Sequence, residues 1–93
     1  MKRFIITRNF PGVSKMTTEQ LDEVGAHSES VLQQMRKEGM QIEQEQSYAA
    51  GDQVFYVYNA DSEELIMEHS KRGSFPVDSI NEVSSILKHN TNQ

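Results

Sequence analysis

Three histidines are the side chains of this 93-residue chain whose charge changes near neutral pH without help from neighbouring groups. His69 follows Glu68 directly. His27 comes four residues after Glu23, where we expect a solvated helix surface, and His89 stands close to the end of the sequence. An imidazole beside a carboxylate can supply two ligands to a divalent transition metal, or the imidazole can act as a general base. No two histidines are four residues apart, so the sequence lacks the histidine pair that one helix can present to a metal.

His69 is the strongest candidate for a functional side chain. It shares one face of a predicted helix with Leu65 and Ile66, so we expect it to point into the protein or into a groove. One interpretation is a structural histidine that is bonded to a backbone carbonyl or a tyrosine. The other is a ligand of a metal ion or small molecule, with Glu68 as the second metal ligand.

Arg8, Tyr48 and Tyr58 are the candidate residues for binding an organic ligand. Arg8 occurs in a predicted strand that is otherwise apolar on its face, where a cation needs a partner or a cavity. The alternative is that its stem packs while its head reaches water. Tyr48, Tyr56 and Tyr58 fall on adjacent predicted strands, and such aromatic residues are typical of a core, an interface or a lined pocket.

Composition excludes several classes of function. The formal charge of −5 argues against binding to the phosphate backbone of nucleic acid, and the absence of cysteine excludes disulfides and thiolate chemistry. The N-terminal segment lacks the length and the cleavage site of a signal peptide, so we expect a cytoplasmic protein that does not enter a membrane. The sequence also lacks the common catalytic motifs and a phosphate-binding glycine loop.

The helix that carries His69 has marked ends. We expect Asp61 to cap its N-terminus, with Glu64 completing a capping box. Gly73 is predicted to take the left-handed conformation at the C-terminus, and Pro76 prevents continuation.

The remaining elements follow from hydrophobic periodicity and turn residues. A second capping box, Thr17 with Gln20, begins a long amphipathic helix, and Gly51-Asp52 fits a two-residue hairpin turn. Strands are predicted over residues 2–10, 40–50, 53–60 and about 80–87, and residues from about 89 to 93 form a flexible tail.

This order, βαββαβ, predicts one α+β domain over residues 1–93 with a ferredoxin-like sandwich of the dimeric α+β barrel type. Four antiparallel strands form the sheet, the two helices cover one face, and the first and third strands are central. Because those strands are apolar on both faces, we expect a second subunit to cover the open face and form a homodimer.

Several segments resemble a family of small bacterial ferredoxin-like proteins of unknown function, which includes an actinobacterial nickel-binding protein. The segments are R-N-F-P-G at 8–12, S-Y at 47–48, F-Y-V-Y-N-A at 55–60, and E-H-x-x-x-G-x-F-P at 68–76. The resemblance implies a dimeric α+β fold and binding of nickel or another divalent transition metal, with Arg8, Glu68 and His69 at matching positions. The chain departs from the common family pattern at Thr7 and Tyr56, where a glutamate and a cysteine are frequent.

The leading hypothesis is a small binding protein that holds nickel, another divalent transition metal or a small ligand near His69. The alternative is a small dimeric α+β barrel enzyme of oxygenase or isomerase type, with His69 as general base and Arg8 orienting an anionic substrate. A third hypothesis is a purely structural interaction domain.

Overall fold

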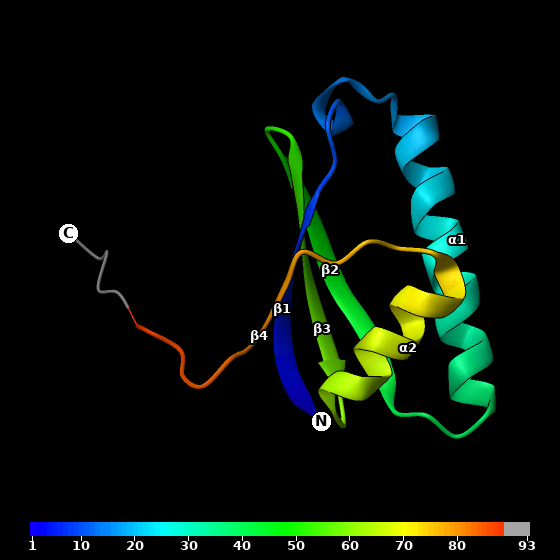
Figure 1. The fold of residues 1–93 in the computed structure, drawn as a ribbon, viewed down its shortest axis with the longest axis vertical. Helices are drawn as coiled ribbons and strands as arrows, with labels where there is room; N and C mark the ends of the chain where they lie inside the picture. Colours follow the sequence, from blue (N-terminus) through cyan, green and yellow to red (C-terminus); the bar gives the residue numbers. More distant parts are fainter. Residues whose placement is uncertain (89–93) are drawn as a thin grey trace.

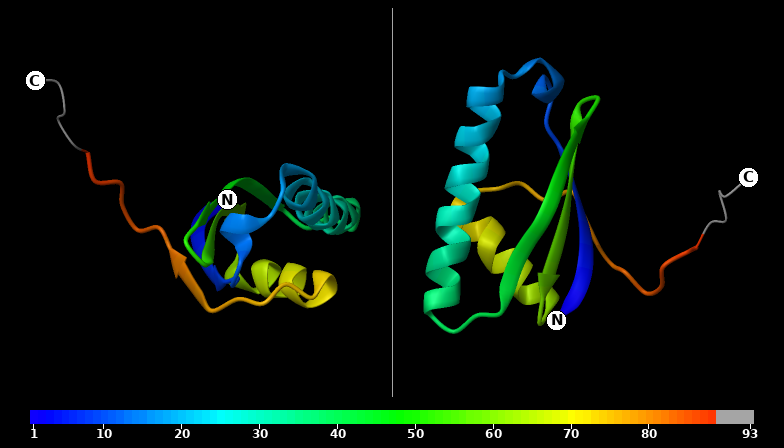
Figure 2. Two further views of the ribbon diagram at one scale, coloured as in Figure 1. Left: turned by 90° about the horizontal axis from the view of Figure 1, so that it is seen from above. Right: turned by 180° about the vertical axis from the view of Figure 1, so that it is seen from behind.

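The computed structural model describes residues 1–88 and has the predicted order of strands and helices (Figure 1). The sheet has the strand order β2-β3-β1-β4, with every neighbouring pair antiparallel. Both long helices cover one face of it (Figure 2), so the ferredoxin-like α+β prediction is confirmed. The elements are β1 (Lys2–Asn9), a short 3-10 helix η1 (Val13–Lys15), α1 (Thr18–Lys37), β2 (Ile42–Ala50), β3 (Gln53–Ala60), α2 (Glu63–Gly73) and β4 (Ser79–Glu82).

The core lies between the sheet and the helices because alternate residues of β1 and β3 point toward α1 and α2. Phe4 and Ile6 of β1 are buried on that face, opposite Leu32 and Met35 of α1 and Ile66 of α2. The central positions of the first and third strands are as predicted.

The long helix α1 begins with the predicted capping box. Thr17 Oγ1 accepts a hydrogen bond from the Gln20 backbone N–H at 3.1 Å, and Gln20 Oε1 accepts one from the Thr17 N–H at 2.9 Å. Gly39, with φ of 93°, follows its C-terminus. Among residues 1–88, no helix is both long and apolar enough to cross a membrane.

The ends of α2 differ from the prediction. Its N-cap is Ser62, without a side-chain cap bond, because the Asp61 N–H is bonded to the Gln41 carbonyl at 3.1 Å and Asp61 thereby continues the sheet. At the other end the left-handed residue is Ser74, with φ of 58°, and Gly73 still belongs to the helix. Gly73 is needed there for space, since a Cβ on it would overlap the ring of Phe75.

The last strand is shorter than predicted, because its pairing with β1 ends near Arg3. β4 pairs antiparallel with β1 from Thr7 down to Phe4, and Val83 N–H donates to the Arg3 carbonyl at 2.8 Å. Beyond this bond, residues 84–88 are not part of the sheet. Residues 83–88 instead leave the domain on the side away from the helices (Figures 1 and 2). The tail predicted from residue 89, with His89, lies outside the described residues.

A β-bulge in β2 decides which of its residues face the helices. The pairing with β3 shifts by one residue between Gln44 and Gln46. Since side chains alternate along a strand, the extra residue Glu45 exchanges the faces of everything after it. Ser47 consequently faces the helices, and Tyr48 lies on the open face opposite Phe55.

Candidate functional site

A cavity of about 260 Å³ lies between the sheet and the two helices, and we call it the inner cavity. This is more room than the roughly 150 Å³ of an apolar cavity that takes up benzene, and it is close to the lower end of small-ligand sites. Its walls are mainly apolar side chains from the sheet and from both helices. They include Ile6, Val54, Leu21, Val24, Ile66 and Phe75.

Polar groups gather at one end of the inner cavity around His69, which is 2% exposed. His69 Nε2 lies 3.2 Å from the Ser28 backbone carbonyl, which can only accept, so Nε2 carries the proton. Nδ1 is then the acceptor and receives a hydrogen bond from the Tyr58 hydroxyl at 3.3 Å. The Ser28 hydroxyl donates to Gln44 Oε1 at 2.9 Å. These four residues, His69, Tyr58, Ser28 and Gln44, form the inner polar cluster.

Burial keeps the inner polar cluster uncharged. Desolvation lowers the pKa of His69 below its ordinary value, and the hydrogen bond to the Ser28 carbonyl only partly opposes this. Desolvation likewise raises the pKa of Tyr58. A ligand in the inner cavity therefore meets a neutral imidazole and a neutral phenol near pH 7.

Phe75 is the aromatic wall that connects the two described histidines. Its ring centroid lies 4.9 Å from that of His69 and 5.2 Å from that of His27. His27, expected to be a solvated surface residue, is exposed overall, yet its Nε2 lies 3.2 Å from the Gly73 carbonyl. The E-H-x-x-x-G-x-F-P segment thus has a physical basis: the glycine leaves space for the Phe75 ring, and the ring contacts His69.

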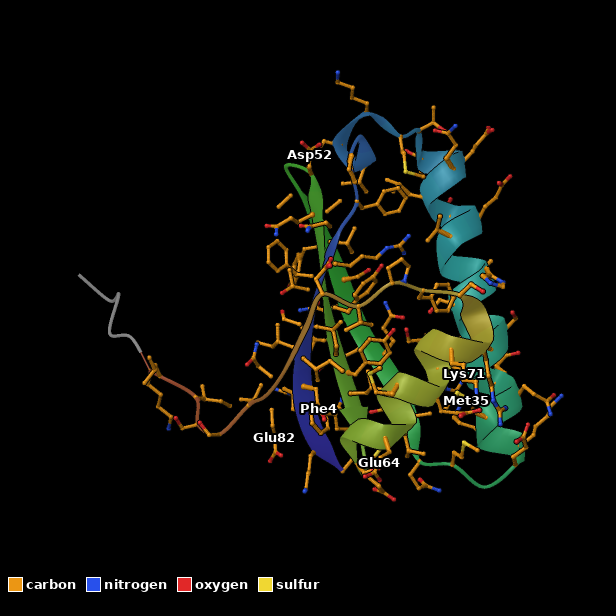
Figure 3. All side chains as sticks on the ribbon, in the orientation of Figure 1. Phe4, Met35, Asp52, Glu64, Lys71 and Glu82 are labelled. Carbon is orange, nitrogen blue, oxygen red and sulfur yellow. The ribbon has the colours of Figure 1, made fainter. Side chains whose placement is uncertain are left out.

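Arg8 does not line the inner cavity itself but contacts two residues that do, Phe10 and Tyr56, and we call this place the mouth of the inner cavity. Its guanidinium carbon lies 4.4 Å from the centre of the Phe10 ring, and Nη1 donates to the Tyr56 hydroxyl at 3.4 Å. Phe10 and Tyr56 both line the inner cavity, while Arg8 and Phe10 line a more open pocket that we call the outer pocket. The loop after β1 is held here because the Phe10 N–H donates to the carbonyl of Asp52 at 2.7 Å, at the tip of the β2–β3 turn (Figure 3).

The structure brings Arg8, Tyr58 and His69 to this region but not Tyr48 or Glu68. Tyr48 is 53% exposed on the other face of the sheet, where the bulge in β2 places it. Glu68 Oε2 accepts a hydrogen bond from Arg72 Nε at 2.6 Å, so its carboxylate is engaged along the surface of α2.

The same arginine, Arg72, ties α2 to the end of α1. Both of its terminal nitrogens donate to the Glu38 carboxylate at 2.8 Å, and this lowers the pKa of Glu38 to about 2. Arg72 therefore competes with any metal ion for the Glu68 carboxylate.

Sequence reasoning missed two members of the inner polar cluster. Ser28 occurs within the apolar stripe of α1, and a small hydroxyl residue among large apolar ones is a signal that could have marked it. Gln44 belongs to a polar run typical of an edge strand, and no local signal distinguishes it from its neighbours. Its role depends on the packing of α1 against β2.

Residues 1–88 do not by themselves complete a transition-metal site. Within residues 1–88 there is no group of three or more histidine, cysteine, aspartate or glutamate side chains that could hold an ion. His69 supplies the only imidazole of the inner polar cluster, and its Nε2 faces a carbonyl. Transition-metal sites in proteins ordinarily need three or four such ligands.

Fold and cavity together define a ferredoxin-like α+β domain with a ligand-sized space between its sheet and helices. The family model described as "Nickel responsive protein SCO4226-like" matches residues 4–83, and the chain belongs to this SCO4226-like family. The family resemblance inferred from the sequence is thereby confirmed.

The fold is similar to that in the crystal structure of SCO4226 from Streptomyces coelicolor A3(2). The TM-score is 0.72 with 19% sequence identity, over 91% of this chain and 99% of that one. A likeness at this identity shows the fold alone. No curated protein matches the chain at a significant level.

Proposed function

We propose that this protein binds a small, mainly apolar molecule in the inner cavity. The proposal rests on three features of this cavity: a volume of about 260 Å³, mostly apolar walls, and a neutral polar cluster at one end. Small-molecule sites commonly pair an apolar lining with a few well-placed polar groups, which fix the orientation of the ligand.

A titration with benzyl alcohol tests this proposal. In ¹H–¹⁵N correlation spectra of the untagged chain, we expect saturable shifts of backbone amides around the cavity, such as those of Ile66 and Phe75. Val24→Phe places a ring in the cavity and should abolish the saturable shifts. The control Ala26→Phe adds the same ring at an exposed position of α1 and should leave them unchanged. Equal binding by both variants would contradict the proposal.

Nickel binding near His69 is a second candidate, and the family description supports it. With one imidazole in the inner polar cluster and Glu68 engaged by Arg72, a complete site needs further ligands from outside these residues. Titration calorimetry with Ni²⁺ on tag-free wild type and His69→Ala decides the matter. Equal heats and affinities for the two proteins would exclude His69 as a ligand.

We further propose that a second copy of the chain covers the open face of the sheet. Ile5 is 42% exposed there beside Val57, and Tyr48 lies next to Phe55. An apolar strip of this kind on a small domain favours self-association. Light scattering at micromolar concentration should give the mass of a dimer, and Val57→Glu should give that of a monomer. A monomeric wild type would exclude this arrangement.

A further inference from the structure

Arg8 carries a charge that no carboxylate neutralises within the described part of the chain. No ion pair involves it among residues 1–88, although five other ion pairs are formed there, four of them by the arginines Arg3, Arg36 and Arg72. Its Nε is buried and has no hydrogen-bond partner among the described residues. Leaving a buried donor of a charged group unsatisfied costs about 1–3 kcal/mol or more, so such a group is a natural place for an anion.

The guanidinium is also held in place. The Phe10 ring lies against it at 4.4 Å, and the Tyr56 hydroxyl accepts from Nη1 at 3.4 Å. Both of these neighbours line the inner cavity. A fixed, planar fork of donors at the mouth of an apolar space suits a carboxylate that is attached to a hydrocarbon body.

We propose that Arg8 and the inner cavity together bind a small monocarboxylate, with the carboxylate on the Arg8 guanidinium and a compact hydrocarbon body inside. This inference rests on the proposed function and adds the chemical class of the ligand. The volume of about 260 Å³ accommodates a body of the size of one aromatic ring. The inner polar cluster is neutral and therefore offers the carboxylate no second cation besides Arg8.

One acidic side chain shares the outer pocket with Arg8. Glu23 lines it together with His27, and its negative charge opposes a second anion at the mouth. A ligand with one carboxylate therefore fits this arrangement better than a dianion, and removal of the Glu23 charge should strengthen binding of the carboxylate.

The test compares benzoate with benzyl alcohol, which have the same ring but differ in charge, on the untagged full chain at low salt. Dissociation constants come from ¹H–¹⁵N correlation titrations. Wild type should bind benzoate at least about tenfold more tightly than benzyl alcohol, as expected for a charge-assisted hydrogen bond. Arg8→Met keeps the apolar stem and should remove this preference while leaving the benzyl alcohol affinity within about twofold.

Two further variants sharpen the result. Arg8→Lys keeps the charge without the planar fork and should retain part of the preference. Glu23→Gln should bind benzoate up to about threefold more tightly than wild type.

Equal wild-type affinities for the two probes, or an unchanged preference in Arg8→Met, would overturn the carboxylate assignment and leave the proposed function standing. Failure of wild type to bind either probe would overturn both. The wild-type comparison stands even where a variant does not fold.

Discussion

The two ends of the inner cavity differ in how completely their polar groups are satisfied. At the inner end, both ring nitrogens of His69 have partners, and the Ser28 hydroxyl donates a hydrogen bond to Gln44 Oε1. At the mouth, Arg8 has a single long hydrogen bond and a buried Nε without a partner among residues 1–88. A saturated buried cluster stabilises the fold, whereas an unsatisfied cation at an opening is available to a ligand.

The largest expected effect is the loss of stability in His69→Ala. It tests whether the inner end of the cavity is structural while the mouth is free to bind a ligand. The variant removes a fully buried ring and leaves the Tyr58 hydroxyl without its acceptor, so we expect a loss of about 2–4 kcal/mol in the free energy of unfolding. Urea unfolding followed by circular dichroism measures it. Arg8→Met should change stability by less than about 1 kcal/mol. Comparable losses for the two variants would show that the mouth is as structural as the inner end.

A smaller loss of stability is expected from substitution of Gly73, which leaves space for the Phe75 ring that contacts His69. In Gly73→Ala the new methyl group overlaps Phe75, and we expect a loss of about 1–3 kcal/mol. The matched control is Gly25→Ala within α1, where a Cβ meets nothing within 4 Å. That variant should gain about 0.5–1 kcal/mol, since alanine is the better helix former. The same thermal or urea unfolding experiment serves both, and a neutral Gly73→Ala would contradict the close packing of Phe75.

The smallest effect is the pH dependence that His69 gives to stability. Its pKa is lowered in the folded protein, so below about pH 6.5 the unfolded chain takes up a proton that the folded chain does not. The contribution of His69 to the free energy of unfolding is therefore fully present above about pH 6.5 and is lost as the pH drops toward the folded pKa. Urea unfolding at pH 7.5 and 5.5 should show a larger decrease for wild type than for His69→Gln. Equal decreases would mean that His69 is not kept neutral by burial.

Local signals in the sequence predicted the helices and strands, and the order of these elements predicted the fold class. The Thr17 capping box, the Gly51-Asp52 turn and the apolar faces of the central strands all occur as expected, because they depend on neighbours in sequence. The inward position of His69 followed from helical spacing in the same way.

The parts of the site that could not be predicted depend on contacts between distant segments. The bulge at Glu45 moves Tyr48 to the open face, and this shift in register leaves no local trace in the sequence. The ion pair that removes Glu68 from the surroundings of His69 is different, because Glu68 and Arg72 are four residues apart on one helix and this spacing could have indicated the pair. The inner cavity itself is also a property of packing, since its walls come from elements that are far apart along the chain.

Ligand uptake by the inner cavity is tested most directly by intermolecular nuclear Overhauser effects between benzoate and the methyl groups of the protein. We predict contacts from the ring protons of bound benzoate to Ile66 and Val24, which line the cavity on α2 and α1. Contacts only to Ile5 and Val57, on the open face of the sheet, or none at any methyl group, would contradict binding in the inner cavity.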